Sequence, residues 1–418
     1  MEWKRVRLGD YISIKSGLAY KGSKIGKGNS ILLGMGCVSF KDKFVESGAR
    51  SYEEDDCDER FLVKPGDIVL ATRQQSNNLP ILAMPAIVPN SFEGKRVIFG
   101  TNLYKVENHS EISSKFLFWL MKHQHYVNYI ASVKSGTAVQ MVTKKNVEDY
   151  KFMCPPIEVR NRISEILWTY DSLIENNTKR IRLLEKMAEN LYKEWFVRFR
   201  FPGYEKAEME NGLPKGWKVE RLGEWGISLD TGKRPKGGID ISLKDGYPSL
   251  GAECIKELAF FDYSSVSLIP KDFYESMKRG KNTGDDILLY KDGAYIGKVT
   301  MFMDKYPYEH YAINEHVFFV APKNVEYKNY LYFTLHQNEF FVLMQNLNRN
   351  AAQPGLSRGD VERVQMTIPT SEVVKQFNQV VKPMLKIMFN LAKQNTLLAR
   401  RRDLLLPRLM SGKLEVKP

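Results

Sequence analysis

The sequence of 418 residues predicts an α+β protein in which two mixed α/β units are joined by two long antiparallel, coiled-coil-like helices, the whole being a pseudo-two-fold internal repeat. Three observations predict this fold. Residues 155–200 carry a long heptad pattern, residues 369–418 carry a second one, and positions in the two halves correspond at a constant offset of 214. Because internal repetition decides architecture before any single element does, each half is expected to follow one plan.

In residues 155–200, apolar side chains recur at alternating steps of four and three, which is the roughly 3.5-residue period of a coiled-coil seam. A helix of about 40 residues is about 60 Å long, so we interpret this segment as a spacer with a partner helix along its seam. The seam runs through Ile163, Leu167, Tyr170, Ile174, Asn177, Ile181, Leu184, Ala188, Leu191 and Trp195.

The partner helix is predicted in residues 369–418 of the same chain. Adding 214 to each seam position gives a second seam in which eight of ten residues are apolar: Phe377, Val381, Met384, Met388, Leu391, Asn395, Leu398, Arg402, Leu405 and Leu409. The same offset joins Trp3 to Trp217, Thr143 to Ser357, Val147 to Val361 and Pro155 to Pro369. These residues of both helices are the candidate pairing and subunit-interface residues.

One polar residue interrupts each seam, Asn177 in the first helix and Asn395 in the second. A buried asparagine can fix the register of a coiled coil. Antiparallel packing would bring the two asparagines face to face as such a layer. The alternative, two unrelated solvated asparagines, has equal weight.

Domain boundaries follow from the repeat: a first unit in residues 1–154, the first helix in 155–200, a linker and second unit in 201–368, and the second helix in 369–418. Residues 201–215 contain glycine, proline and charge without periodicity, which is typical of a linker. In the first unit we expect one amphipathic helix over residues 113–130 and a strand over 147–153. In the second we expect the matching amphipathic helix over residues 327–343.

Composition excludes several classes. The 62 Lys and Arg residues outnumber 49 Asp and Glu, giving a net charge of +13, which favours a polyanionic partner, although many basic proteins bind none. No apolar run reaches the about 18 residues of a membrane helix, and the charged N-terminus is unlike a signal peptide. Four widely spaced cysteines favour reduced thiols in a cytoplasm, and neither a zinc site nor any other metal site is expected.

Motifs for catalysis are missing from the sequence. It has no Walker loop and no Asn/Asp-Pro-Pro-aromatic tetrapeptide of amino-methyltransferases. Residues 33–36 (LGMG) resemble the start of a dinucleotide or S-adenosylmethionine loop, but a third glycine is lacking, so a tight turn is expected. Asp285 and Asp286 are interpreted as another turn. We therefore predict no catalytic residue, no bound cofactor and no enzyme activity.

What remains is binding by polar, basic loops. Lysine, arginine, glycine and amide side chains together hold phosphates and read base edges, although a charged loop is more often merely solvated. Both copies carry such loops at matching places. The candidate DNA-binding residues are Lys21, Lys24, Arg73, Gln74, Gln75, Asn77, Asn78, Lys134, Ser135, Thr137 and Gln140 in the first copy, and Lys233, Arg234, Lys236, Lys291, Tyr295, Lys298, Arg349, Asn350 and Gln353 in the second.

Four strings at the helix ends are distinctive: residues 191–199 (LYKEWFVRF), 201–203 (FPG), 213–217 (LPKGW) and 402–412 (RDLLLPRLMSG). With the tandem repeat, they resemble the specificity (S) subunits of type I restriction–modification systems over the whole chain. The resemblance implies that two target-recognition domains each read half of an asymmetric, bipartite site in double-stranded DNA. It also implies that the paired helices set the spacing between the half-sites.

The resemblance further implies partners: two modification subunits that methylate adenine with S-adenosylmethionine, and restriction subunits that add ATP- and Mg-dependent translocation and cleavage. This chain itself would be non-catalytic. The alternatives are a specificity subunit of a related methyltransferase or type IIB-like system, or a fused methyltransferase or nuclease. A further alternative is a scaffold whose basic loops bind acidic protein, which salt-dependent binding to mixed DNA would exclude through counterion release.

Overall fold

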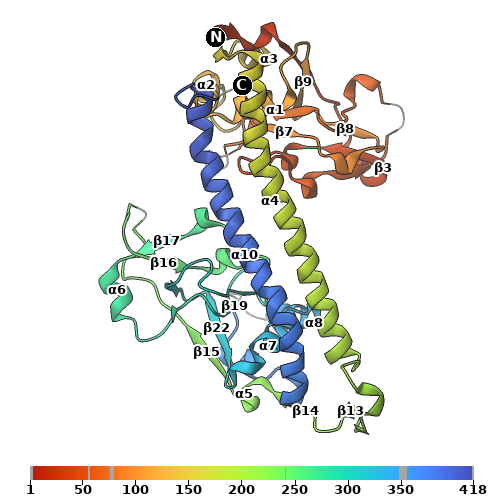
Figure 1. Ribbon diagram of the computed structural model, residues 1–418, viewed down its shortest axis with the longest axis vertical. Helices are drawn as coiled ribbons and strands as arrows, with labels where there is room; N and C mark the ends of the chain where they lie inside the picture. The colour runs from red at the N-terminus through yellow and green to blue at the C-terminus, as the bar shows by residue number, and fades with distance from the viewer. Residues whose placement is uncertain (1–2, 55–56, 76–79, 241, 348–354, 417–418) are drawn as a thin grey trace. The chain divides into compact units, whose positions relative to one another are not determined.

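The computed structural model describes residues 3–54, 57–75, 80–240, 242–347 and 355–416 (Figure 1). The chain forms two compact units. Unit 1 comprises Met1–Ser172 and Leu398–Pro418, and unit 2 comprises Leu173–Leu397. The two long helices, α4 (Ile157–Tyr192) and α10 (Ser371–Met410), each contribute one part to each unit. The predicted domain boundaries stay a prediction, because the compact units divide the chain within the helices.

Unit 1 contains two main sheets. One has the strand order β2-β9-β5-β7 and the other the order β4-β3-β8. The first consists of β2 (Ile12–Ser16), β9 (Leu103–Asn108), β5 (Ile68–Ala71) and β7 (Pro85–Ile87), and the second of β4 (Arg50–Tyr52), β3 (Ile25–Leu33) and β8 (Val97–Phe99). Strands β3 and β8 run parallel, and all other pairs in these sheets are antiparallel.

Unit 2 repeats this topology. The order β15-β22-β19-β20 matches the first sheet of unit 1, and β17-β16-β21-β18 matches the second with one added strand. The strands are β15 (Ile227–Thr231), β22 (Val317–Pro322), β19 (Ile287–Tyr290), β20 (Val299–Met301), β17 (Ser267–Ile269), β16 (Tyr247–Leu250), β21 (Tyr311–Ile313) and β18 (Lys281–Asn282). A short helix, α6 (Lys271–Ser276), follows β17. The parallel pair recurs as β16 and β21, so the predicted duplication is confirmed at the level of strand order.

A two-stranded ribbon precedes each long helix and keeps the offset of 214 in its register. In unit 1, β1 (Lys4–Arg7) pairs with β11 (Lys151–Cys154), with Lys4 opposite Cys154. In unit 2, β14 (Lys218–Arg221) pairs with β23 (Gln365–Ile368), with Lys218 opposite Ile368. Each copy also has a short capped helix before the ribbon's second strand, α3 (Lys144–Glu148) or α9 (Arg358–Glu362), and α5 (Leu222–Trp225) follows β14.

The long helices run antiparallel within each unit. In unit 1, Ile163 and Leu167 of α4 share a buried cluster with Leu409 of α10. In unit 2, the rings of Trp195 and Phe377 lie 5.9 Å apart. All twenty predicted seam positions are buried or half-buried. This is expected, because side chains that recur about every 3.5 residues lie on the face of the helix that contacts its partner. The predicted pairing is therefore confirmed.

The two asparagines form crossed pairs in unit 2. The amide of Asn177 donates to Gln394 Oε1 at 3.5 Å, and the amide of Asn395 donates to Thr178 Oγ1 at 3.3 Å. Each asparagine thus bonds to the sequence neighbour of the other. The polar layer expected from the sequence is present, but it has four members in place of a facing pair.

The single helices predicted over residues 113–130 and 327–343 are each two helices. Residues 114–133 form α1 (Ser114–Lys122) and α2 (Gln124–Val133), separated by His123 in an extended conformation. At about 100° per residue, Tyr126 would point about 240° away from Leu120 in one straight helix. Both side chains are buried, because the break at His123 turns α2 so that Tyr126 also faces the core. In unit 2, α7 (Lys328–Leu335) and α8 (Asn338–Leu347) are also separate helices, although His336 at the end of α7 keeps a helical backbone conformation.

Two other local predictions are corrected. Residues 147–153 are not one strand, because Thr143 and Asn146 form a capping box that starts α3, and β11 follows. The first long helix ends at Tyr192, before a π-helical turn over Lys193–Val197. That turn lets the consecutive residues Trp195 and Phe196 both reach the core, where Phe196 lies 4.7 Å from the ring of Tyr330.

The linker of residues 201–215 is more ordered than its composition predicts. It contains a hairpin of β12 (Met209–Glu210) and β13 (Leu213–Pro214). The ring of Phe201 is buried and stacks on Trp217 at 5.4 Å. The four cysteines are buried, and none of them forms a disulfide. Among the described residues, no helix has both the length and the apolar content needed to cross a membrane.

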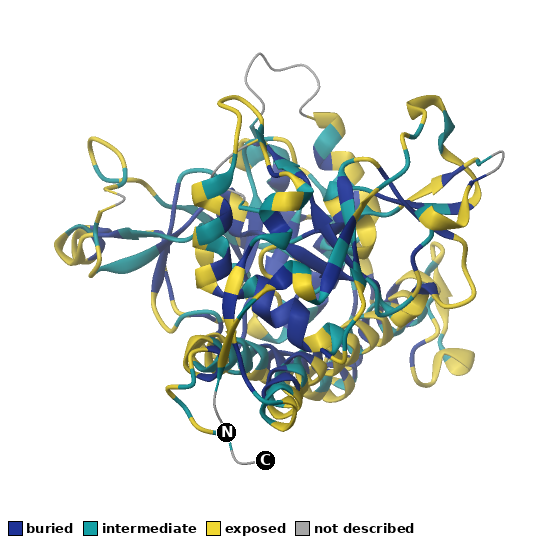
Figure 2. Cartoon of the chain, turned by 90° about the horizontal axis from the view of Figure 1, so that it is seen from above, coloured by how far each residue is buried: buried dark blue, intermediate teal, exposed yellow. Residues whose placement is uncertain are grey.

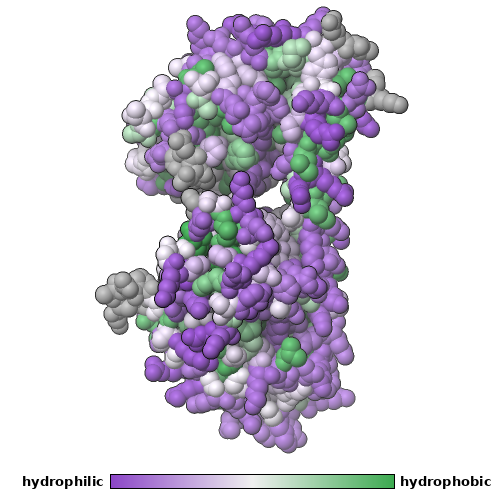
Figure 3. Space-filling model, turned by 90° about the vertical axis from the view of Figure 1, so that its left-hand side faces the viewer, coloured by the Kyte–Doolittle hydropathy of each residue, from purple (hydrophilic) through white to green (hydrophobic). Residues whose placement is uncertain are grey.

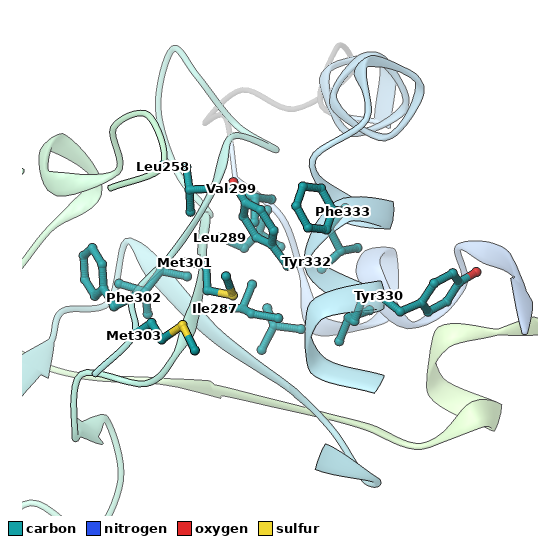
Figure 4. Close-up of a cluster of buried hydrophobic side chains, with 14 of the residues drawn as sticks. Leu258, Ile287, Leu289, Val299, Met301, Phe302, Met303, Tyr330, Tyr332 and Phe333 are labelled. Carbon is teal, nitrogen blue, oxygen red and sulfur yellow. The ribbon is translucent and has the colours of Figure 1, made fainter. Parts of the chain in front are cut away.

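The core of each unit lies between its sheet strands and the inner faces of its helices, whereas loops and outer helix faces are exposed (Figure 2). In unit 2, Ile287 and Leu289 of β19, Val299 and Met301 of β20, and aromatic residues of α7 form one buried cluster (Figure 4). The face of the chain shown in Figure 3 is mostly hydrophilic over both units, with small scattered apolar patches.

Candidate nucleic-acid interface

In unit 1, two of the predicted loops are joined by a short ribbon. Strand β6 (Arg73–Gln74), which follows β5, pairs with β10 (Gln140–Met141). The segment from Ser135 to Met141 closes on itself through two backbone hydrogen bonds of 3.0 and 2.8 Å. Gly136 has a φ of +91°, which glycine adopts without steric cost. Segments more than 60 residues apart in sequence therefore form one surface feature, which we call the paired loop of unit 1 (residues 73–75 and 134–141).

Gln74 holds this paired loop together. Its side chain is 6% exposed, its amide nitrogen donates to Gln140 Oε1 at 2.7 Å, and its amide oxygen accepts from the backbone of Ile81 and Leu82. Lys134 Nζ also donates to Gln140 Oε1, at 3.0 Å. Since a base contact needs a free amide edge, Gln74 positions the loop and does not present a reading group.

The outward groups of the paired loop are Gln75, Ser135 and Thr137, which are exposed, and Arg73, which is half-buried. Burial raises the pKa of Tyr104, and the positive charge of Arg73 opposes that shift, so the guanidinium lies close to this phenol. The Tyr104 hydroxyl donates to the carbonyl of Val142 at 3.2 Å. The loop therefore offers an amide, two hydroxyls and a cation from a braced base.

Lys21 and Lys24 belong to a different part of unit 1. They lie just before β3, whose bulged start pairs with β4. The backbone N–H of Lys21 donates to the Tyr52 hydroxyl at 3.3 Å, and the carbonyl of Lys24 accepts from Glu53 at 3.1 Å. These two lysines therefore form a second basic group on the sheet β4-β3-β8, separate from the ribbon of the paired loop.

In unit 2, an ion network connects two of the predicted loops. Arg234 pairs with Glu315 at 3.2 Å, and His316 bridges Glu315 at 3.3 Å to Asp292 at 3.1 Å. Lys291 completes the chain through Asp292 at 3.1 Å. The loops after β15 and β19 therefore lie together, and their cations are partly neutralised by acids that the sequence did not single out.

Several other predicted DNA-binding residues of unit 2 are exposed to solvent. Lys233 and Lys236 are exposed, and Lys233 Nζ lies 5.5 Å from the ring centre of Phe273. Tyr295 is 62% exposed, which is unusual for an aromatic side chain and suits stacking on a base. Lys298 is half-buried and pairs with Glu257 at 3.2 Å, so it braces its own loop.

The loop that precedes α3 or α9 docks at the same place in each copy. In unit 1 the N–H of Val142 donates to the carbonyl of Thr72 at 3.2 Å. In unit 2 the N–H of Leu356 donates to the carbonyl of Lys291 at 3.0 Å. Both acceptors follow the equivalent strands β5 and β19 within the same sheet order. The candidates Asn77, Asn78, Arg349, Asn350 and Gln353 lie outside the described residues.

A second feature was missed by the sequence argument, which placed subunit contacts in the seam. The seam is buried between the helices, but apolar side chains also face outward at repeat-related positions. Leu173 and Ile387, which are 214 apart, are 46% and 43% exposed, and Leu183 and Leu397, also 214 apart, are 63% and 55% exposed. We call these four residues the outer apolar pairs. The offset that found the seam could have found them.

The architecture defines a class: a tandem repeat of one α/β unit, with each copy holding paired polar loops and sharing two antiparallel helices. A solved structure described as the S subunit of a type I restriction–modification system from M. genitalium has this fold. It aligns over 100% of this chain and 97% of its own with a TM-score of 0.57 and 14% identity.

The type I restriction modification DNA specificity domain matches the chain twice, over residues 1–186 and 214–406. The chain is also 24% identical to the type I restriction enzyme MjaIX specificity subunit of Methanocaldococcus jannaschii, over 90% of this chain and 84% of the relative. It is 22% identical to the HindI specificity subunit of Haemophilus influenzae, over 99% and 100%. The chain therefore belongs to this family: it is a type I specificity subunit, a DNA-recognition component and not an enzyme.

Proposed function

We propose that this chain recognises an asymmetric, bipartite site in double-stranded DNA, with one half read by each copy of the repeat. The observation that carries the proposal is the equivalent docking of the segments that precede α3 and α9, through Val142 on Thr72 in unit 1 and Leu356 on Lys291 in unit 2. A shared scaffold with different side chains in the loops is what two readers of different sequences require. The net charge of +13 supplies attraction to phosphates.

In unit 1 the proposed readers are Gln75, Ser135 and Thr137, with Arg73 contacting a guanine edge or a phosphate. Amides and guanidinium groups pair bidentately with purine edges, at about 1–3 kcal/mol of discrimination each. In unit 2, Lys233, Lys236 and Tyr295 take this role by charge and stacking. The long helices set the spacing between the half-sites.

We further propose that two modification subunits, which carry S-adenosylmethionine and methylate adenine, bind the outer apolar pairs. Large apolar side chains that stay exposed mark protein interaction sites when they cluster. Their recurrence at the offset of 214 gives two equivalent docking positions, one for each modification subunit. Restriction subunits with ATP and Mg would join this complex in a bacterial or archaeal cytoplasm, and this chain would bind none of the cofactors of methylation or cleavage, which are S-adenosylmethionine, ATP and Mg.

Mapping of methylated adenines in a host that expresses the chain with its modification subunits tests DNA reading. Gln75→Ala is expected to make one half of the methylated motif degenerate, and Tyr295→Ala the other half. Lys151→Ala and Lys218→Ala are matched controls, because both lysines are exposed on the ribbon strands β11 and β14 and belong to neither set of loops. A loop variant that degrades both halves equally, or neither, contradicts the assignment of one half-site to each copy.

Leu183→Glu and Leu397→Glu test the partner surface. Each is expected to remove one modification subunit from the complex, which analytical ultracentrifugation would detect as a lighter species. Arg182→Gln, at an exposed neighbour on α4, changes the net charge by the same single unit and is the charge-matched control. Full assembly of both leucine variants would place the modification subunits elsewhere on the chain.

A further inference from the structure

Two carboxylates and one imidazole meet in unit 2. Glu185 and Glu189 lie one turn apart on α4, and His336 follows α7. One ligand atom from each lies within 4.8 Å of the others. His336 Nε2 is 3.2 Å from Glu189 Oε1. Each of the three residues is half-buried, so an ion could enter from solvent.

A buried hydroxyl without a partner points to a missing ligand at the same place. Tyr332, one turn before His336 on α7, is 0% exposed, and its hydroxyl has no hydrogen-bond partner among the described residues. Its ring stacks on the ring of His336 at 5.2 Å. Burial raises the pKa of this phenol, and the negative charges of Glu185 and Glu189 raise it further. Leu258, near which Tyr332 lies in Figure 4, bonds to Glu185 through its backbone.

The first copy of the repeat serves as an internal control. Subtracting 214 from His336 and Tyr332 gives Lys122 and Phe118. Lys122 Nζ donates to the carbonyls of Phe40 and Asp42 at 2.9 and 2.7 Å. Burial lowers the pKa of Lys122 to about 8, which still leaves it largely charged at neutral pH. At the position of the imidazole, unit 1 therefore has its own cation, and at the position of the phenol it has no hydroxyl to satisfy.

The residues that the long helices place opposite these positions also differ between the two copies. Adding 214 to Glu185 and Glu189 gives Ala399 and Asp403. Asp403 is paired with Arg402 at 2.8 Å. At the four repeat-equivalent positions, unit 1 thus has one carboxylate and one amine, whereas unit 2 has two carboxylates, an imidazole and a hydroxyl without a partner among the described residues.

We propose that Glu185, Glu189 and His336 bind one divalent transition-metal ion of the zinc class, with Tyr332 beside it as a fourth polar group. Two carboxylate oxygens and an imidazole nitrogen at about 2.0–2.2 Å form a common ligand set for Zn²⁺, and a tetrahedral site puts ligand atoms about 3.4 Å apart. Imidazole disfavours Mg²⁺ and Ca²⁺, which take oxygen ligands. The ion would tie α7 of the second recognition unit to α4.

The cysteine and histidine spacing of the sequence did not reveal this cluster, because its ligands come from two helices far apart along the chain. The proposal is independent of DNA reading. It concerns an ion held by the free chain, so failure of one proposal leaves the other intact.

Calorimetry with ZnCl₂ on the full-length, chelator-treated chain tests the site, and Co²⁺ absorption reports its geometry. We expect one ion per chain with a micromolar or tighter dissociation constant. Glu185→Gln, Glu189→Gln and His336→Asn should each weaken it by about 100-fold, since each removes one of three ligands. Tyr332→Phe should shift the Co²⁺ spectrum. Glu165→Gln on the exposed face of α4 and His125→Asn in unit 1 are matched controls.

His336→Lys installs the residue of the first copy and supplies a fixed cation. This variant is expected to fold with an unchanged or raised Tm without metal and to bind no Zn²⁺, which separates ligand loss from unfolding. The proposal is overturned if the parent chain binds no Zn²⁺ at a free Zn²⁺ concentration about 100 times the expected micromolar dissociation constant. It is equally overturned if the three ligand variants bind the ion as the parent does, because the ion then lies elsewhere.

Discussion

Arg402 is one of the two seam positions in α10 that are not apolar, and the structure gives it a buried partner. Arg402 Nη1 donates to Asp171 Oδ1 at 2.5 Å within unit 1, and the two side chains are 14% and 4% exposed. The guanidinium also lies over the ring of Trp119 at 5.5 Å. Replacing Arg402 by methionine keeps the apolar contact of the long side chain but leaves the Asp171 carboxylate buried without this partner.

The expected loss of stability is about 3 kcal/mol at pH 7. Removal of one partner from a buried ion pair costs about 3–5 kcal/mol, because an uncompensated charge stays behind. The lower end applies here, since Lys43 and Lys122 also act on Asp171. Asp171→Asn should cost less than Arg402→Met, because the arginine keeps its contact with Asp403 at 2.8 Å.

The pH dependence has a defined sign. Burial raises the folded-state pKa of Asp171 above its ordinary value, and the charge of Arg402 opposes that shift. Loss of Arg402 raises the pKa further. A group with a raised folded-state pKa stabilises the fold when it is protonated and loses that contribution as pH rises through this pKa. The deficit of Arg402→Met should therefore be largest at pH 7–8 and shrink towards pH 5.

Hydrogen exchange of peptides from α1, followed by mass spectrometry between pH 5 and 8 with the intrinsic exchange rate corrected, gives the opening free energy of unit 1. Asp171→Asn with Arg402→Met completes a double-mutant cycle, with an expected coupling of about 1–3 kcal/mol. A loss below about 1 kcal/mol, or one that is constant with pH, would refute the reasoning that the carboxylate stays buried and charged.

Three further predictions concern the long helices. Asn395→Leu should raise the unfolding free energy of unit 2 by about 1 kcal/mol, because Asn395 Oδ1 is buried without a hydrogen-bond partner among the described residues. Urea denaturation measures this change, and a loss of stability would mean that the hydrogen bonds of the polar layer are well satisfied. Leu184→Asp or Leu398→Asp should cost about 3 kcal/mol by placing a charge in the seam and should impair subunit assembly, measured by gel filtration with the modification subunits. Insertion of four residues near the middle of α4 should change the spacer of the methylated DNA site and leave both half-sites intact, as read from the methylome; altered half-sites would argue against a spacer role.

The long-range plan of this chain could be predicted from sequence because two signals are periodic. The 3.5-residue seam and the offset of 214 are each repeated many times, so chance agreement at one position matters little. The local geometry within each unit was harder to predict from the sequence. The break at His123 depends on two apolar sets that must face one core, and only the packed core shows that both Leu120 and Tyr126 are buried.

Side-chain roles in the loops could be predicted only in part. The sequence identifies Gln74 and Gln75 as equal candidates, but strand alternation turns Gln74 inward, where Gln140 and two backbone N–H groups occupy its amide. Nothing near Asp292 in sequence indicates that His316 will lie against it. Such contacts depend on the register between distant segments, and a single sequence does not encode that register in any local pattern.

The repeat shows where the chain tolerates change. The offset is 214 at the ribbon, where the N–H of Leu8 donates to Tyr150 and that of Leu222 to Val364, at 2.7 and 2.8 Å. Between these points it drifts: β5 begins at Ile68 and β19 at Ile287, an offset of 287 − 68 = 219. Insertions and deletions therefore accumulate inside each unit and cancel before the long helix begins. Because loops on a fixed scaffold can vary at little cost in stability, each reader can change its loops while the ribbon and the helix that follow it keep their register. A specificity subunit needs this separation, since its DNA target must be able to change without altering the surface that its partner subunits bind.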